Sequence, residues 1–456
     1  MNFKEVLGIG EAFRHGNLIT RLSLLILGLG SLVHRQIGRF VLFFALELGY
    51  ILYMLTVGIT SVRNMITLGL VEQGEVFNEA KGIYEYSLGD NSMLFLLYGV
   101  ITILITLSFI CFMMGSVRCA YQAQVDSRAG KKLPGILQDV KSLFDYNIHK
   151  FLLTWPMLGL IIFTVTPLIF MVTIAFTNYD RNHQPPGQLF DWVGFANFSD
   201  ILGLGGSSQL SNTFWPVLIW TLVWAFFATF SNYILGMLLA ILINRKGTRL
   251  KGMWRFFFML SIAMPAFITL LTMRTVFHNN GAFNILLRAL NILGPLETIS
   301  YFGDPLLSKI TVIMVNIWIG VPFTLLITTG ILKNIPEELY EAAEVDGANK
   351  FVTFFKITLP YMIFITTPYL ITQFTGNINN FNVIFFLTNG EPLTLDYYIA
   401  GKTDLLITWL YKLTITNKDY NLGSVIGILS FVLMAVCSLL TYRFTGSYKD
   451  EEAFQK

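Results

Sequence analysis

Eight long apolar stretches are the feature that most limits how this chain can fold. A helix needs about 20 consecutive, mostly apolar residues to cross the hydrocarbon core of a bilayer, and each stretch reaches that length. Inside a bilayer the backbone must satisfy its own hydrogen bonds, which favours helices over loops. The sequence therefore predicts an all-α polytopic membrane protein with about eight transmembrane helices. We place the spans at roughly 38–60, 93–115, 151–177, 214–243, 254–277, 309–332, 360–379 and 424–444.

The composition excludes several other classes of protein. Of the 456 residues, 54% are hydrophobic and only 13% are charged, whereas about 25% of a soluble domain is charged. The net charge of +3 gives no argument for a nucleic-acid partner. Cys111, Cys119 and Cys437 show neither metal-ligand nor disulfide spacing, so we interpret them as packing residues.

Lysine and arginine are concentrated in three segments, which predicts the orientation of the chain. Short cytoplasmic loops carry an excess of positive charge. Three segments are basic: the leader before the first span, loop 116–150 and turn 244–255. Loop 61–92 has an excess of acidic residues, and loop 178–213 contains Arg181 as its only lysine or arginine. We therefore expect a multi-pass protein of the cytoplasmic (cell) membrane. Both termini and residues 333–359 would lie in the cytoplasm.

The N-terminal region and two ionisable residues leave alternatives open. The apolar run 22–33 is short and lacks a cleavage site, so we predict no cleavable signal. Arg21 interrupts the wider segment 17–33, which we interpret as an interfacial helix lying on the membrane surface. Glu47 falls inside the first span and Arg274 near the outer end of the fifth. Ionisable residues inside a membrane are candidates for a functional role. The alternative is a structural role, in which the residue is paired in the protein interior or, for Arg274, snorkels to the membrane surface.

The segment 334–360 is polar and has a helical pattern, although it lies between two apolar spans. Asn334 is expected to cap a helix, with Glu337 as its capping-box partner. Gly347 would end or bend this helix, because glycine tolerates the left-handed conformation of a C-cap. A second short helix would follow up to Pro360, which would begin the seventh span. From these residues alone, an ordinary amphipathic loop and a docking element for a cytoplasmic partner are equally supported.

The spacing within this segment is specific. The pattern EAA-x3-G-x9-I-x-L-P is matched at every fixed position, by Glu341, Ala342, Ala343, Gly347, Ile357, Leu359 and Pro360. It resembles the EAA loop of importer-type ABC permeases, and Asp346 and Ala348 fit the DGA form common in sugar importers. VNIWIG at 315–320, NINNF at 377–381, LTNGEP at 387–392 and TDLL at 403–406 are similar to the maltose/maltodextrin permease subunit of the MalF type. The match covers roughly residues 151–450.

The resemblance implies a type I ABC importer permease fold and a role in transport, without catalysis by this chain. The expected function is that of a permease subunit for oligosaccharides, with maltose and maltodextrins leading and galactan-derived oligosaccharides as the alternative. Implied partners are a second, MalG-like permease, two ATPase subunits that bind ATP and Mg, and an extracellular sugar-binding protein. No cofactor or metal is expected in this chain. The ATPase-coupling residues would be Glu341, Ala342, Ala343, Asp346, Gly347 and Pro360.

The same resemblance suggests a division of the chain. Residues 1–36 would form a cytoplasmic or interfacial segment, and 37–150 two N-terminal spans with a cytoplasmic loop. Residues 151–446 would form a six-helix permease core that contains the coupling loop 334–360. Residues 447–456 would be a cytoplasmic tail.

Amides and aromatic residues in the sixth and seventh spans suggest where a sugar could bind. Asn316, Gly320 and Phe323 fall on one helix face, at i, i+4 and i+7. Buried amides need partners, so from the residues alone a wet cavity and helix–helix contacts are equally supported. The resemblance implies a sugar site, and the residues that we expect there are Asn316, Trp318, Gly320, Phe323, Gly376, Asn377 and Asn380.

Three departures from the best-known member of that family affect the expected ligand. Phe323 replaces a tyrosine and Gly376 replaces a phenylalanine, which predicts a roomier pocket for a longer or differently linked oligosaccharide. The loop 178–213 is short where that member has a large extra domain. A short loop suits a binding protein that is tethered to the membrane.

We do not expect an ATPase site in this chain. Gly401-Lys402-Thr403 is the tail of a Walker A motif, but Asp396 occupies the position of its first glycine. ATP hydrolysis must then come from a separate subunit. A self-sufficient carrier is disfavoured by the intact EAA pattern and by the lack of an internal repeat. A permease for amino acids or glycerol phosphate is disfavoured because the sixth and seventh spans have no basic cluster to hold phosphate.

Overall fold

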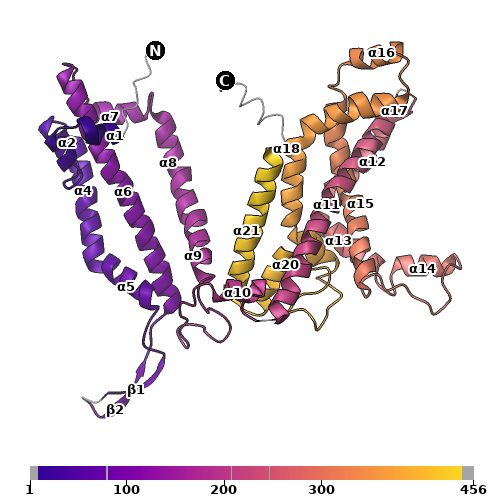
Figure 1. Cartoon of the computed structure of the whole chain (residues 1–456), viewed down its shortest axis with the longest axis horizontal. Coiled ribbons are helices and arrows are strands. Elements are labelled where there is room, and N and C mark those ends of the chain that lie inside the picture. Colours follow the sequence, from indigo (N-terminus) through magenta and orange to yellow (C-terminus); the bar gives the residue numbers. More distant parts are fainter. Residues whose placement is uncertain (1–8, 79–80, 207, 246, 444–456) are drawn as a thin grey trace. The chain divides into compact units, whose positions relative to one another are not determined.

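The computed structural model describes residues 9–443, apart from 79–80, 207 and 246. The expected tail at 447–456 lies outside these residues. By internal contacts the chain forms two compact units, one up to Gly194 and one from Phe195 onward, and each is described by itself (Figure 1). The predicted domain boundary at residue 151 stays a prediction.

The prediction of about eight apolar helices is confirmed. In the described part of the chain, seven helices are long and apolar enough to cross a membrane, and a bent pair brings the number to eight. The seven are Ile37–Thr67, Ser92–Arg128, Ile148–Ile174, Gln209–Asn244, Pro305–Leu332, Lys350–Ile378 and Tyr420–Thr441, and the bent pair is Lys251–Ala263 with Ala266–Val276.

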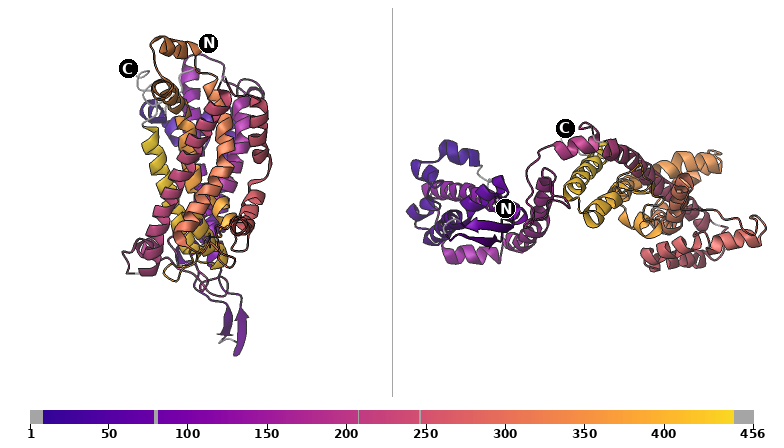
Figure 2. Two further views of the ribbon diagram at one scale, coloured as in Figure 1. Left: turned by 90° about the vertical axis from the view of Figure 1, so that its right-hand side faces the viewer. Right: turned by 90° about the horizontal axis from the view of Figure 1, so that it is seen from below.

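The first unit contains three of the long helices and a β-hairpin. Its elements are α1 (Ile9–His15), α2 (Leu18–Leu22), α3 (Leu29–Val33), α4 (Ile37–Tyr53), α5 (Ile59–Thr67), β1 (Gly74–Asn78), β2 (Ile83–Ser87), α6 (Ser92–Arg128), α7 (Ile136–Leu143), α8 (Ile148–Leu160) and α9 (Thr166–Ile174). Turns of π-helix join α4 to α5 and α8 to α9, at Met54–Gly58 and Ile161–Val165. The strands are antiparallel, with Gly74 opposite Ser87, and extend away from α5 and α6 (Figure 2).

Residues 17–33 form two short helices, so the expected single interfacial helix is wrong. Between α2 and α3 the chain turns inward, and the backbone N–H of the buried Leu27 donates to Glu47 Oε2 at 2.8 Å. The hydroxyl of Thr20 donates to Gln124 Oε1 of α6 at 2.7 Å. These bonds satisfy polar groups that a helix lying on a surface would leave to water. Glu47 is therefore paired inside the unit, as the simpler of our two interpretations had it.

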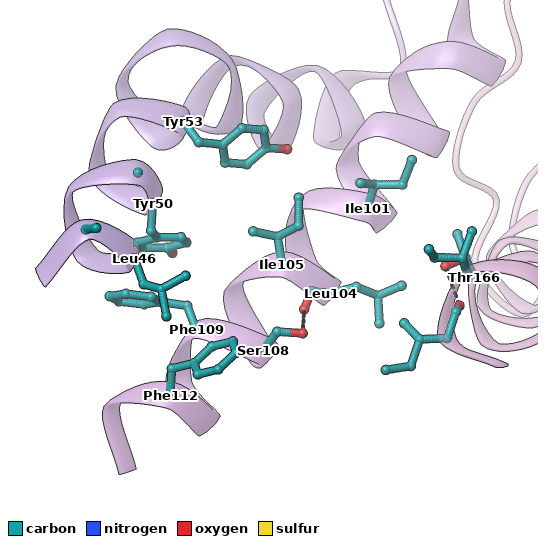
Figure 3. A pocket seen from close by; sticks show the side chains of 14 residues that line it. Leu46, Tyr50, Tyr53, Ile101, Leu104, Ile105, Ser108, Phe109, Phe112 and Thr166 are labelled. Carbon is teal, nitrogen blue, oxygen red and sulfur yellow. Dashed lines mark hydrogen bonds between the residues drawn. The ribbon is translucent and has the colours of Figure 1, made fainter. Parts of the chain in front are cut away.

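An apolar groove of about 670 Å³ lies between α4, α6 and the π-helical turn at Ile161–Val165 (Figure 3). The rings of Tyr50 and Phe109 stack there, with their centroids 3.9 Å apart. The hydroxyl of Tyr50 donates to Thr106 Oγ1 at 3.2 Å, and the oxygens of Tyr53 and Thr102 lie 2.8 Å apart. Hydroxyl groups in this apolar region thus bond α4 to α6.

The second unit carries the remaining long helices. Its elements are α10 (Ala196–Leu202), α11 (Ser208–Asn244), α12 (Lys251–Ala263), α13 (Ala266–Val276), α14 (Ala282–Ala289), α15 (Pro305–Leu332), α16 (Glu337–Val345), α17 (Lys350–Thr353), α18 (Leu359–Ile378), α19 (Phe381–Leu387), α20 (Leu406–Tyr411) and α21 (Tyr420–Tyr442). Turns of π-helix lie at Phe354–Thr358 and Lys412–Thr416.

The core of this unit lies where α11 packs along α15 and α18. Trp220 and Trp224 of α11 are buried there, with Val312 of α15 and Leu387 of α19. Both indole nitrogens have partners, because Trp220 Nε1 donates to the Thr403 carbonyl at 3.0 Å and Trp224 Nε1 donates to the Asn377 carbonyl at 3.1 Å. A buried tryptophan needs such a partner. The two bonds fix α11 against the end of α18 and against the segment around Thr403.

The fifth span is broken, so its prediction as one helix over 254–277 is wrong. α12 and α13 meet at an angle of 91°. Pro265 lacks an N–H and disfavours a helical conformation for the residue before it. Met264 is accordingly extended, with φ −84° and ψ 133°.

The seventh span is longer than predicted. Residues Lys350–Ile378 form one continuous helix, so the expected separate helix ending at Pro360 is wrong. Pro360 lies in the first turn of α18 and follows the π-helical turn Phe354–Thr358. A π-helical turn changes the backbone pairing locally, which accommodates the missing N–H of proline without ending the helix.

Candidate functional site

The coupling segment begins differently from our expectation. α15 continues to Leu332, so Asn334 lies in a turn, where its N–H donates to the Ile331 carbonyl at 2.9 Å. Its own carbonyl accepts from the hydroxyl of Tyr361 at 3.3 Å. The N-cap of α16 is Pro336, without a side-chain hydrogen bond. The predicted Asn334 cap is therefore wrong.

The predicted role of Gly347 as a helix C-cap is confirmed. Its φ is +71°, a left-handed conformation that costs other residues free energy. The N–H of Gly347 donates to the Glu344 carbonyl at 3.1 Å, and that of Ala348 to the Ala343 carbonyl at 2.9 Å. This pair of bonds is the Schellman motif. Asn349 then caps α17, with its Oδ1 accepting from the Val352 N–H at 2.9 Å.

The resulting bend, which we call the elbow (residues 337–358), exposes apolar side chains. Val345 is 88% exposed and Phe351 is 77% exposed, and Phe355 is also on the surface. Glu341 and Ala342 are exposed, while Ala343 is buried. An apolar patch flanked by polar residues is typical of a protein-interaction surface.

The elbow is firmly attached to the helices beneath it. The hydroxyl of Tyr340 in α16 bonds Thr358 Oγ1 at 3.1 Å, which joins the two arms of the elbow. Ile335 and Met362 pack with Tyr233 of α11 in a buried cluster. A groove of about 1320 Å³ separates the elbow from the end of α11, and Glu344 is among its lining residues. In Figure 1, α16 lies at the end of this unit away from α14 and α20.

The amides lie at the opposite end of the same continuous helix. Asn377 Nδ2 donates to Thr229 Oγ1 of α11 at 3.0 Å, and Asn380 Nδ2 donates to Asn377 Oδ1 at 3.4 Å. Asn380 Oδ1 accepts from the Val383 N–H at 3.3 Å and so caps α19. The structure therefore brings Asn377 and Asn380 together and bonds them to α11.

Gly320 allows α11 and α15 to approach each other closely. A Cβ atom at Gly320 would lie 2.1 Å from Asn232 Nδ2, so a larger residue would have to displace this amide or the helix. Asn316 lies one turn earlier on the same face and is buried. Within the described residues, Asn316 Nδ2 and Asn232 Oδ1 are buried without a hydrogen-bond partner. Leaving such an atom unpaired costs about 1–3 kcal/mol, so a ligand that supplies partners would be favoured.

A cavity of about 50 Å³ lies beside this contact. Gly320 and Phe323 line it, together with Thr229, Asn232, Tyr233, Tyr369 and Gln373. Sites for organic ligands usually have about 300–1,000 Å³, and this volume is close to that of one or two water molecules. The polar lining suits a sugar, but the site is closed in this conformation.

Of the seven expected sugar contacts only Gly320 and Phe323 line the cavity, and the other five, Asn316, Trp318, Gly376, Asn377 and Asn380, are not among its lining residues. Trp318 is 62% exposed and points to another side of α15. Gly376 is exposed, and a Cβ there would meet no atom within 4 Å. Conversely, Asn232, Tyr369 and Gln373 line the cavity but were not expected from the sequence. Asn232 could have been found as a lone amide in the fourth span, whereas the other two needed the packing of α11 on α18.

Comparisons with known proteins agree with this geometry. Residues 232–447 match the family model described as "Binding-protein-dependent transport system inner membrane component". The galactooligosaccharides transport system permease protein GanP of Bacillus subtilis is 35% identical over 79% of this chain and 85% of its own. The maltodextrin transport system permease protein MdxF of the same organism is 32% identical over 93% of this chain and 95% of its own.

A solved structure shares the fold. It is described as a bacterial ABC transporter involved in the import of the acidic polysaccharide alginate, and the matched chain is 21% identical, with a TM-score of 0.51. The match covers 67% of this chain and 96% of that one. The relatives extend over nearly the whole sequence, and the resemblance expected from the EAA pattern is confirmed. The chain belongs to the binding-protein-dependent transport system inner membrane components, as an ABC importer permease of the MalF type.

Proposed function

We propose that this chain is the membrane-spanning permease subunit of an ATP-driven importer for neutral oligosaccharides, with maltodextrins as the first candidate. The observation that carries the proposal is the continuous helix Lys350–Ile378, which has the elbow at one end and the amides at the other. At 1.5 Å per residue the path along the axis of this helix, which contains Pro368, is about 43 Å. It joins a protein-docking surface to a polar cavity.

The helix suggests how force reaches the cavity. A partner that moves the elbow moves α17 and α18 together, since Tyr340 and Thr358 are bonded across its two arms. The far end of α18 carries Asn377, which is bonded to Thr229 of α11. Tilting α18 would therefore separate α18 from α11 beside the cavity. The small cavity would open while a ring of amides and hydroxyls remained around it.

The partners follow from the chain's incomplete surfaces. The exposed apolar elbow needs a cytoplasmic protein, and we propose an ATPase subunit on it, two per complex, which would bind ATP and Mg. A second, MalG-like permease and an extracellular sugar-binding protein complete the importer. The basic loops at 116–150 and 244–255 support an orientation with the elbow and both termini in the cytoplasm.

Sugar is favoured as the substrate because the cavity offers amides, hydroxyls and aromatic rings without a charged side chain among its lining residues. Relatives named for maltodextrins and for galactooligosaccharides are both similar over most of the chain. Gly376 lies outside the closed cavity but directly precedes Asn377, and we propose that the open space there belongs to the sugar path, which would suit an oligosaccharide longer or differently linked than maltose. Galactan-derived oligosaccharides are therefore the second candidate.

The test is purification of the tagged chain from its native membranes in mild detergent, followed by reconstitution of the complex into vesicles. We expect a second permease and an ATPase to co-purify, and ATP-dependent uptake of maltotetraose or of a β-galactotetraose with the cognate binding protein. Recovery of the chain alone, with uptake that needs no ATP, would contradict the proposal.

A further inference from the structure

A second pocket lies in the segment between α19 and α21. It has about 640 Å³, which is within the usual range for small-molecule sites. Its polar and aromatic lining residues include Phe385, Asn389, Glu391, Tyr397, Tyr411 and Lys412. The orientation proposed above puts this segment on the outer side of the membrane, at the end of the unit away from the elbow.

The loop that forms the pocket is held by buried hydrogen bonds. Thr403 Oγ1 donates to the Glu391 carbonyl at 2.6 Å and lies 2.9 Å from Thr388 Oγ1. Trp409 Nε1 donates to the Tyr398 carbonyl at 2.8 Å. Ile399 has a φ of +55°, which a β-branched residue adopts only under constraint. The walls are therefore preformed, which reduces the entropy lost when a ligand binds.

Lys412 gives the pocket a directed donor. Its Nζ donates to Asp404 Oδ2 at 2.6 Å and to the Asn389 carbonyl at 2.8 Å. An ammonium group has three hydrogens, so one is left for a ligand. The buried Asp404 balances this charge, and Glu391 at the rim lies 3.7 Å from Arg274. The two charged lining residues, Lys412 and Glu391, are thus each opposed by a neighbouring charge.

Aromatic rings form the rest of the lining. Lys402 Nζ lies 3.6 Å from the centroid of the Tyr397 ring and covers one of its faces, which holds the ring in place. Tyr411 meets Phe385 edge to face, with centroids 5.5 Å apart. Apolar ring faces beside separate hydrogen-bond donors and acceptors are complementary to a pyranose, which has apolar C–H faces and hydroxyls at its edge.

The pocket is close to the amides of α18. Asn380 caps α19, and Phe385 lies five residues further along that helix, about 7.5 Å along its axis. We propose that the pocket is a second carbohydrate subsite, which holds one sugar ring of a neutral oligosaccharide before the oligosaccharide reaches the cavity between α11 and α15. The proposal rests on the proposed function and deepens it. It predicts that longer saccharides depend on the pocket more than shorter ones.

The experiment uses the whole reconstituted importer with its binding protein. Uptake of maltotriose and maltohexaose is measured, and in parallel uptake of β-galactotriose and β-galactohexaose, for the wild type and for Tyr397→Ala, Tyr397→Phe and Tyr86→Ala. Tyr86 is a matched control, because it is an exposed tyrosine of β2 in the other unit. Assembly of each variant is checked by size-exclusion chromatography of the complex.

We expect Tyr397→Ala to raise the ratio of the hexaose KM to the triose KM about tenfold, with kcat for the hexaose preserved. Tenfold corresponds to a lost contact of about 1.4 kcal/mol. Tyr397→Phe keeps both ring faces and should recover most of the affinity, and Tyr86→Ala should match the wild type.

An unchanged ratio in a well-assembled Tyr397→Ala complex would overturn the subsite. An equal rise in KM for both lengths, with weaker stimulation of ATPase activity by the binding protein, would also overturn it and would identify the pocket as a protein contact. Wild-type vesicles that take up none of the four saccharides would overturn the proposed function, and the subsite with it. Failure of the proposed function and failure of the subsite are distinguishable, because the former appears in the wild type and the latter only in the Tyr397→Ala variant.

Discussion

The two ends of the helix Lys350–Ile378 use polar and apolar side chains in opposite ways. At the elbow, apolar side chains such as Val345 and Phe351 are exposed. Beside the other end, amides are buried or half-buried, and two of their buried atoms, on Asn232 and Asn316, have no partner in the described part of the chain. A folded protein on its own is more stable with the reverse arrangement. Each end is therefore incomplete in the isolated chain, and each lacks a different thing: a protein surface at the elbow, and hydrogen-bonding groups at the cavity.

We expect the largest effect from a variant that disables the elbow and leaves the cavity intact. Proline cannot adopt the φ of +71° at Gly347 and removes the N–H that bonds Glu344. We expect Gly347→Pro to lower ATP-dependent uptake by at least about 100-fold, the effect of about 2.7 kcal/mol. Uptake assays on reconstituted complexes measure this.

The matched control at this position is Gly347→Asn, because asparagine tolerates the left-handed conformation. It should keep most of the uptake. A Cβ at Gly347 would meet no atom within 4 Å, so neither variant should disturb the core. Normal transport by a well-expressed Gly347→Pro variant would contradict the coupling role of the elbow.

The next largest effect should come from the cavity end. In Gly320→Ala the new methyl group would collide with Asn232, which forces α11 and α15 apart or displaces the amide. We expect a loss of about 1–3 kcal/mol in the free energy of unfolding, as for other overpacked contacts. Thermal unfolding in detergent and uptake should both report it.

Gly330→Ala on the same helix provides the comparison, since a Cβ there meets nothing within 4 Å. It should be neutral or slightly stabilising. Adding Asn232→Ala to Gly320→Ala removes the collision and should recover part of the stability. Purely additive losses in that double variant would show that Asn232 and Gly320 are not coupled.

A third variant tests whether the open space at Gly376 sets the ligand. Gly376→Phe would add an aromatic face where the structure has space. We expect the preference for maltotriose over maltohexaose to rise about tenfold, which is about 1.4 kcal/mol of discrimination. Competition uptake with labelled saccharides measures the preference, and an unchanged ratio would place Gly376 outside the sugar path.

The smallest expected effect concerns the link between the two arms of the elbow. Tyr340→Phe removes the hydroxyl that bonds Thr358, a loss of about 0.5–1.5 kcal/mol. We expect a few-fold lower ratio of saccharide imported to ATP hydrolysed, with ATPase activity retained. Tyr361→Phe, which loses only its bond to the Asn334 carbonyl, should keep the ratio. Equal ratios for the two variants would show that the hydrogen bond between Tyr340 and Thr358 does not contribute to the coupling of ATP hydrolysis to transport.

Much of the fold was predictable because lipid leaves the backbone few choices. Apolar length alone located each span and was right about their number, but the second span runs on to Arg128 instead of 115 and the seventh begins at Lys350 instead of 360. Spans failed where a local residue acted against the hydropathy pattern. Pro265 breaks the fifth span, whereas Pro360, which follows a π-helical turn, does not break the seventh. Hydropathy contains no information that separates these two prolines.

The site was predictable where it depends on local backbone and not where it depends on packing. The cap at Gly347 follows from the conformational freedom of one residue and its neighbours. Asn334 failed as a cap because α16 begins only at Glu337, with Pro336 as its N-cap. Asn377 was singled out in the sequence, but its partner Thr229 lies 148 residues away and could only be found in three dimensions.

The sequence by itself determined that this chain has the apolar spans of a multi-pass membrane protein, that it carries the EAA pattern and that amides interrupt two of its spans. These depend on composition, spacing and short-range conformation. Only the tertiary structure showed that the coupling loop and the amides are the two ends of one helix, that Asn232 completes the cavity and that a second pocket lies beyond Asn380. These depend on which helix faces pack together, and side-chain packing between distant segments has no signature in local sequence.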